Sequence, residues 1–202
     1  MKIVIVGASG TVGRAVVAEL DQNGQHELIH VGHRQGDLLV DLTDEASVDA
    51  LFARTGKVDA IIATTGNVFF GPLNEMTAED FTLGLQDKLL GQVRLALKGQ
   101  HFLNDGGSIT LTSGIIADVP IAQGVNATTV NAALAGFVKA AACELPRGIR
   151  INLVSPTLLT ESEAAYGPFF PGFESVPAAR VALAFRRSVE GVQSGQVFKV
   201  GY

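Results

Sequence analysis

Short runs of apolar, β-branched residues recur along the chain, and stretches with helical spacing of apolar positions lie between them. The first run, Ile3–Val6, has the composition of a strand buried on both faces of a parallel sheet. Further strands are predicted at 27–31, 38–40, 58–63, 108–112, 149–154 and 196–200, and helices at 11–22, 45–54, 77–101, 128–144 and 177–190. This alternation, without a clear break, predicts a single doubly wound α/β domain over residues 1–202, with a parallel sheet of about seven strands and helices on both faces.

A glycine-rich turn, Gly7–Gly13, joins the first predicted strand to the first predicted helix. Strand, glycine turn and helix form the context that the dinucleotide fingerprint of a Rossmann-type domain requires. The spacing is Gly-x-x-Gly-x-x-Gly rather than Gly-x-Gly-x-x-Gly, and the alternative is a turn that binds no ligand. Helix N-termini bind phosphates through free amides and a positive dipole end. The expected phosphate-binding residues are Gly7, Ser9, Gly10, Thr11, Val12 and Gly13.

The second predicted strand ends at His33 and Arg34, where the adenosine ribose lies in this fold. NAD sites usually have Asp or Glu at this position to bind the ribose hydroxyls. A guanidinium suits a 2′-phosphate and does not replace that carboxylate, so the sequence predicts NADP(H) in preference to NAD(H). The alternative is a solvated arginine in a loop.

The charge and the apolar pattern exclude several classes of partner. The net charge is −5 and no basic run occurs, which argues against nucleic acid. No apolar stretch is long enough to span a membrane, and the N-terminal run is too short for a signal peptide. The single cysteine, Cys143, lies among alanines and is expected to be a small core residue, which fits a reducing compartment. We therefore expect a cytoplasmic protein that binds neither nucleic acid nor membrane.

Several segments, in order over almost the whole chain, resemble motifs of the short-chain dehydrogenase/reductase family. Gly7–Gly13 resembles its nucleotide turn, and Gly107–Ser113 resembles the strand that leads to its active-site serine, at Ser113. Arg150–Pro156 resembles the segment before the nicotinamide. Further cofactor contacts that the resemblance implies are Asp41 and Leu42 at the adenine, Thr64, Thr65 and Gly66 in place of an Asn-Asn-Ala-Gly motif, and Pro156.

The chain departs from the family at the catalytic residues. The Tyr-x-x-x-Lys motif falls on Ala127–Asn131, so Ala127 replaces the tyrosine and Asn131 the lysine. In the family the tyrosine supplies a proton, and the lysine lowers the pKa of that tyrosine and binds ribose. The family's helix asparagine falls on Lys88. Its ammonium is a candidate to bind ribose hydroxyls or to polarise a substrate oxygen beside Ser113; the alternative is a surface lysine.

Three other polar groups have both a functional and a structural interpretation. Ser113 is either the residue that orients the substrate oxygen or a strand-end hydroxyl that satisfies local backbone groups. Asn131 can form hydrogen bonds in the site, but it cannot act as an acid, and a structural role is the alternative. Tyr166 lies in an aromatic, proline-containing stretch, 158–176, that can form a lid; there it is either a proton donor or part of an apolar lid.

Together these features predict an NADP-preferring oxidoreductase that transfers hydride between nicotinamide and a small carbonyl or alcohol. Ser113 is the expected catalytic residue, with Lys88 and Asn131 as further candidates, and no metal site is expected. The alternative is a non-catalytic NADP(H)-binding sensor or scaffold, which loss of the Tyr-Lys pair favours. The resemblance also implies a homodimer or homotetramer.

Overall fold

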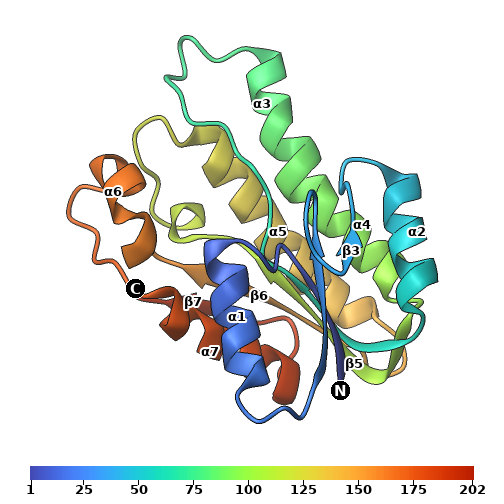
Figure 1. The fold of residues 1–202 in the computed structure, drawn as a ribbon. Coiled ribbons are helices and arrows are strands. Elements are labelled where there is room, and N and C mark those ends of the chain that lie inside the picture. Colours follow the sequence, from blue (N-terminus) through green and yellow to red (C-terminus); the bar gives the residue numbers. More distant parts are fainter.

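A seven-stranded parallel sheet with helices on both faces forms the centre of the computed structural model, which describes residues 1–202 (Figure 1). The strand order is β3-β2-β1-β4-β5-β6-β7, which confirms the predicted fold class. The strands are β1 (Lys2–Val6), β2 (Glu27–Gly32), β3 (Leu38–Leu39), β4 (Val58–Ala63), β5 (Leu103–Thr112), β6 (Arg150–Pro156) and β7 (Val197–Val200). Because β1 pairs with both β2 and β4, the order reverses between β1 and β4, where such sheets bind ligands.

The helices divide between the two faces and bury a separate apolar layer on each. α1 and α7 lie side by side over one face, and α2, α4 and α5 cover the other (Figure 1). Side chains of β1 alternate between these layers: Ile3 and Ile5 pack beneath α1 and α7, and Val4 and Val6 face the opposite helices. The helices are α1 (Thr11–Asp21), α2 (Glu45–Thr55), α3 (Ala78–Gly84), the π-helix η1 (Leu85–Leu90), α4 (Gly91–Gly99), η2 (Ile115–Ala117), α5 (Val125–Glu144), η3 (Thr160–Ser162), α6 (Glu163–Tyr166), η4 (Gly167–Phe169) and α7 (Ala178–Glu190).

The single helix predicted over 77–101 is divided by a π-helical turn. It begins as expected, with a capping box in which the Thr77 hydroxyl accepts from the Asp80 amide at 3.1 Å. The π turn η1 then separates α3 from α4. Gly84 and Gly91 flank this turn, and a Cβ at either would collide with a neighbour, the Asn126 side chain for Gly84 and Leu42 for Gly91. The glycines therefore permit close packing around a turn that propensity alone does not predict.

Two smaller expectations are corrected. β5 begins at Leu103 rather than Ser108, because the intervening residues form an irregularity in the pairing with β4. Cys143 is exposed, since it lies on the face of α5 that points away from the sheet. None of the helices combines the length and the hydrophobicity that a membrane-spanning segment requires.

Candidate active site

A cleft of about 580 Å³ opens over the carboxyl ends of β1, β2 and β4, at the point where the strand order reverses. Its walls combine the glycine turn, the loop after β2 and the loop after β4. The residues predicted to bind cofactor that line it are Gly7, Ser9, Gly10, His33, Arg34, Asp41, Leu42, Thr64 and Thr65. Segments far apart in the sequence therefore meet in one cleft of a size suited to a nucleotide.

The glycine turn has the close contacts expected of a phosphate-binding turn. Gly7 has a φ of +86°, and a Cβ there would lie 2.8 Å from the Thr64 carbonyl oxygen. A Cβ at Gly13 would collide with the carbonyl of Gly7, so only glycine lets α1 start against the turn. Gly10 is the N-cap of α1 and offers no side-chain cap, and no acidic residue lies in the first turn. The N-terminal amides of α1, which include those of Thr11, Val12 and Gly13, are thus free of intrahelical partners and suited to a pyrophosphate.

The adenosine end of the cleft presents cationic and polar groups. His33 and Arg34 are exposed beside it, with no carboxylate at the position that usually binds ribose in NAD sites. Asp41 also lines the cleft, and its carboxylate accepts from the Thr43 hydroxyl at 2.7 Å and from the Thr43 amide at 2.8 Å. These hydrogen bonds hold the pKa of Asp41 below its ordinary value, so the carboxylate stays charged and oriented.

A second pocket, of about 230 Å³, contains all three predicted catalytic residues. Lys88 comes from η1, Ser113 follows β5, and Asn131 comes from α5. Pro156, at the end of β6, also lines this pocket rather than the larger cleft. The remaining lining is mostly apolar and aromatic: Val68, Phe70, Ile115, Ile116, Leu158, Leu159, Tyr166 and Phe170, with Gly114, Thr157 and Ser162.

Ser113 and Asn131 are both buried at the base of this pocket. The Ser113 hydroxyl donates to the main-chain carbonyl of Asn131 at 3.1 Å, and the Ser113 amide donates to Val154 on β6 at 2.9 Å. The side-chain oxygen of Asn131 is buried and has no hydrogen-bond partner. An unsatisfied buried acceptor is uncommon in folded proteins and points to a donor that comes from a ligand or water.

The Lys88 side chain is partly buried and lines the second pocket. Burial lowers the pKa of Lys88 to about 8, while neighbouring Asp87 opposes that change. Its ammonium takes part in none of the ion pairs of the structure. Gly66, with a φ of +126°, lies against the stem of Lys88, and a Cβ there would be 2.5 Å from Lys88 Cγ. The one glycine kept from the Asn-Asn-Ala-Gly motif therefore makes room for this lysine.

Consecutive residues of η1 line different cavities. Asp87 lines the larger cleft, and Lys88 lines the smaller pocket. Asp87 accepts from the Asn67 amide at 3.2 Å and from the Asn67 side chain at 2.6 Å. This contact ties the loop after β4 to η1 and links the walls of the two cavities.

The position of the missing tyrosine is occupied by packed apolar groups. Ala127 is fully buried and packs with Ile115 and Ile116. Tyr166 lies across the pocket on α6, with its ring centroid 6.3 Å from that of Phe70. The structure thus brings Tyr166 to the pocket as part of an aromatic wall.

One residue that supports the site was not predicted from the sequence. Gln92, on α4, is fully buried, accepts from the Thr112 amide at 2.8 Å and donates to the Thr112 carbonyl at 2.9 Å. Its amide also donates to the Lys88 carbonyl at 3.2 Å. Gln92 therefore fixes η1 against the end of β5, next to Ser113. A polar residue on an otherwise apolar helix face is the signal that could have indicated it.

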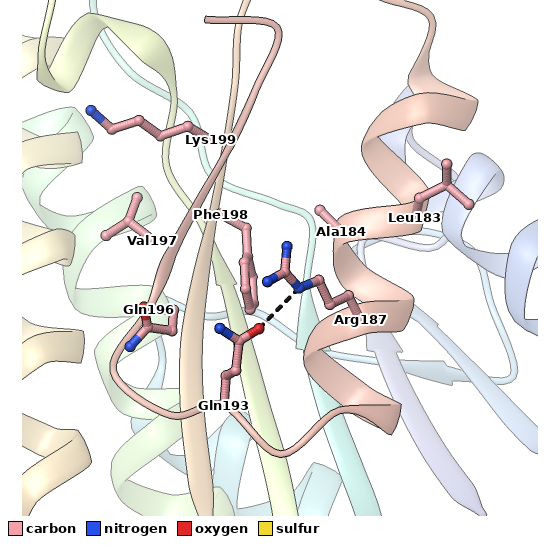
Figure 2. Close-up of a pocket in the computed structure, with 8 residues that line it drawn as sticks. All are labelled: Leu183, Ala184, Arg187, Gln193, Gln196, Val197, Phe198 and Lys199. Carbon is pink, nitrogen blue, oxygen red and sulfur yellow. Dashed lines mark hydrogen bonds between the residues drawn. The ribbon is translucent and has the colours of Figure 1, made fainter.

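Another groove, of about 400 Å³, lies between α7 and the edge strand β7 (Figure 2). Arg187 stacks over the Phe198 ring at 4.9 Å and donates to the Gln193 side chain at 2.9 Å, while Lys199 points to the other side of the strand. None of the predicted site residues lines this groove. No group of three or more His, Cys, Asp or Glu side chains is placed to hold a metal ion.

Comparison with known proteins gives a consistent classification. A family model described as enoyl-(acyl carrier protein) reductase matches residues 2–195. The crystal structure of the protein lin1944 from Listeria innocua is 48% identical, with a TM-score of 0.97 and 99% of both chains covered. A small-chain dehydrogenase in complex with NADPH is 25% identical, with a TM-score of 0.89, over 99% of this chain and 96% of that one. Hydroxynaphthalene reductase arp2 of Aspergillus fumigatus is 23% identical over 89% of this chain and 76% of its own.

This chain belongs to the short-chain dehydrogenase/reductase family of NAD(P)-dependent oxidoreductases. The resemblance read from the glycine turn, the Ser113 strand and the Arg150–Pro156 segment is thereby confirmed.

Proposed function

We propose that this protein is an NADP-preferring oxidoreductase that interconverts a small carbonyl compound and its alcohol with an atypical set of catalytic residues. The observation that carries the proposal is the convergence of Lys88, Ser113 and Asn131 on one pocket next to the dinucleotide cleft. A scaffold that had only kept its nucleotide turn would have no need of a buried serine, a partly buried lysine and an unpaired amide oxygen around one small cavity.

The cofactor preference rests on the chemistry of the larger cleft. The glycine turn and the start of α1 would hold the pyrophosphate, and Arg34 with His33 would hold the 2′-phosphate. Asp41 and Leu42 would contact the adenine, and Thr64, Thr65 and Gly66 would lie along the cofactor toward the second pocket. The NADPH complex of a related small-chain dehydrogenase supports this assignment. When bound, the nicotinamide supplies or accepts the hydride.

The lining of the smaller pocket supports a compact, apolar or aromatic substrate with one carbonyl oxygen. Phe70, Phe170 and Tyr166 offer flat contact surfaces, and no carboxylate lines this pocket. In the proposed arrangement the Ser113 hydroxyl turns away from the Asn131 carbonyl and donates its hydrogen bond to the substrate oxygen. The Lys88 ammonium stabilises negative charge on that oxygen and is acidic enough, with its pKa lowered to about 8, to give it a proton.

A non-catalytic NADP(H)-binding protein is the second candidate function. It is favoured by the replacement of the family's tyrosine by Ala127, whose surroundings are packed and apolar. Assembly into a homodimer or homotetramer belongs to the proposal as well. It is supported by the exposed apolar side chains of Leu90 and Leu97, which lie about two helical turns apart along η1 and α4. The cytoplasmic location stays a prediction.

The test begins with titration of the purified protein with NADPH and NADH, followed by nicotinamide fluorescence. We expect NADPH to bind more tightly, and Arg34→Glu to weaken NADPH by about tenfold or more while NADH changes little. An equal effect on both cofactors would overturn the assigned preference.

A panel of small aldehydes, ketones and quinones then tests catalysis with the preferred cofactor. Turnover that Ser113→Ala lowers by about 10²-fold, without a change in cofactor affinity, would support the oxidoreductase. Tight NADPH binding with no turnover on any member of a broad panel would favour the sensor or scaffold.

A further inference from the structure

Tyr202, which follows β7, forms hydrogen bonds to two other segments of the chain. Its hydroxyl lies 2.6 Å from the Ser155 hydroxyl on β6 and donates to the Asp118 carboxylate at 3.1 Å. Ser155 is only 1% exposed, whereas Tyr202 is 40% exposed, so the contact runs from the surface into the core. Gly201, with a φ of +91°, turns the chain toward this contact, and a Cβ there would lie 2.5 Å from Thr157 Cγ2. Both the conformation and the close approach require glycine, so the backbone itself places Tyr202 here.

Asp118 connects Tyr202 to a wall of the second pocket. It follows η2 directly, and its amide donates to the Ile115 carbonyl at 2.9 Å. Ile115 and Ile116 line the pocket, whereas Asp118 does not. Lys199 Nζ lies 3.1 Å from the same carboxylate oxygen that accepts from Tyr202, and 5.2 Å from the centre of the Tyr202 ring. The carboxylate therefore receives two donors from the segment around β7, and a movement of η2 would break both contacts.

Ser155 places the same contact beside Ser113. The Ser113 amide donates to the Val154 carbonyl at 2.9 Å, which continues the parallel pairing of Thr112 with Val154 by one residue. Ser113 and Ser155 are therefore neighbours on adjacent strands, with their side chains on the same face of the sheet. The Tyr202 hydroxyl thus joins η2 to the strand next to the expected catalytic serine.

The Tyr202 phenol acts as a hydrogen-bond donor in this arrangement rather than as an acid. Burial, aided by the charge of Asp118, raises the pKa of Tyr202 to about 12. The phenol therefore keeps its proton at neutral pH, and its hydrogen bond to Asp118 persists. Tyr202 lines neither the second pocket nor the larger cleft, so it is not placed to contact substrate or cofactor.

We infer that Tyr202 and Asp118 are positioning residues that hold η2 against β6 and so set the width of the second pocket. This inference rests on the proposed oxidoreductase function and adds a determinant of which carbonyl compounds the pocket accepts. The main-chain hydrogen bonds that end at Ala117 and Asp118 stay within the turn, so apolar packing alone would hold η2 without this contact. The pocket would then be wider and less ordered, while the larger cleft would be unaffected.

The experiment compares Y202F and D118N with the matched control D105N. The first variant removes one hydroxyl, and the second removes the charge that accepts from it. Asp105 likewise forms an exposed ion pair, with Arg147 at 3.0 Å, but it lies near the start of β5, at the far end of that strand from η2. The measurements are amide hydrogen exchange at residues 114–119, affinity for the preferred nicotinamide cofactor, and kcat and KM for a narrow aliphatic ketone and a wide aromatic ketone.

We expect the amides of residues 114–119 to exchange about fivefold faster in both variants, because each loses a hydrogen bond that involves a charge and so favours local opening. KM for the narrow ketone should rise about fivefold while kcat changes by less than about twofold. The ratio of the two kcat/KM values should shift toward the wide ketone, since a wider pocket loses contacts mainly with the narrow one. Cofactor affinity should stay at the wild-type value, and D105N should match the wild type throughout.

Three results would overturn the role of Tyr202 and Asp118. Exchange at residues 114–119 could match that of D105N, it could rise with no change in the preference between the two ketones, or it could rise equally throughout the protein. If thermal melting shows that D118N does not fold, Y202F decides alone, because it removes only a hydroxyl. A wild-type protein that binds cofactor but reduces no carbonyl compound would instead refute the oxidoreductase function, and the positioning role with it.

Discussion

Replacing Lys88 by methionine should stabilise the free protein, even though it removes a residue of the proposed site. Burial lowers the pKa of Lys88 from 10.5 to about 8. A change of one pKa unit corresponds to about 1.4 kcal/mol, so the charged amine destabilises the folded protein by at most about 3 kcal/mol. The actual cost is smaller than this limit, because water that reaches the partly buried ammonium screens its charge. Methionine fills a similar volume without a charge, so Lys88→Met should raise the free energy of unfolding at pH 7 by about 2–3 kcal/mol.

The pH dependence provides the sharper test. Between the folded-state pKa of about 8 and the ordinary value of 10.5, the unfolded chain binds a proton that the folded chain has released. The destabilisation caused by Lys88 should therefore become smaller as the pH rises across this window, and the free energy of unfolding of the wild type should increase accordingly. The advantage of Lys88→Met should fall to about half of its pH 7 value near pH 9.5.

Urea denaturation of the cofactor-free protein, followed by circular dichroism at pH 7 and pH 9.5, measures both quantities. Lys139→Met serves as the control, since it removes a lysine from the exposed face of α5 and should leave the pH dependence of wild type intact. The reasoning would be refuted if Lys88→Met were no more stable than wild type at pH 7, or if its advantage were the same at both pH values.

Two further predictions concern the packing of glycine and glutamine residues. Gly13→Ala should abolish detectable cofactor binding and lower the melting temperature, because the added Cβ collides with the glycine turn. Gly136→Ala is the control: a Cβ there would meet nothing within 4 Å, so in the same thermal melts this variant should stabilise the helix by up to about 1 kcal/mol. Gln92→Leu should cost about 2–3 kcal/mol in urea denaturation, since it leaves the Thr112 amide and carbonyl without their side-chain partner; a loss below about 0.5 kcal/mol would contradict a supporting role for Gln92.

The strands and the dinucleotide cleft were accessible from the sequence because their signals are local. Ile3–Val6 is apolar at every position, and only glycine fits at Gly7 and Gly13, so pattern and spacing together indicate a buried strand followed by a phosphate-binding turn. Strand order then follows from the parallel, right-handed connections of such folds. For these reasons the sequence alone predicts that His33 and Arg34 lie in the same cleft as the glycine turn, where the structure has them.

The π turn and the role of Gln92 were not accessible, because both depend on contacts between distant segments. Helical propensity over 77–101 contains nothing that specifies where a turn widens; that depends on Gly84 meeting Asn126 and Gly91 meeting Leu42. The exposure of Cys143 likewise depends on which face of α5 meets the sheet, and an alanine-rich helix has too weak a polar pattern to show it. The catalytic assignments of Lys88, Ser113 and Asn131 remain predictions, although they now concern residues that share a pocket.

The contact between Gly66 and Lys88 has a consequence for how the site responds to a ligand. A free lysine side chain loses about 2 kcal/mol of rotamer entropy when it is held in one conformation. Here the stem lies against the backbone of Gly66, so much of that ordering takes place when the protein folds rather than when a ligand arrives. A hydroxyl or carbonyl oxygen that enters the pocket therefore meets a preorganised charge. Because the lysine loses little further conformational entropy on binding, most of the favourable energy of this contact contributes to affinity.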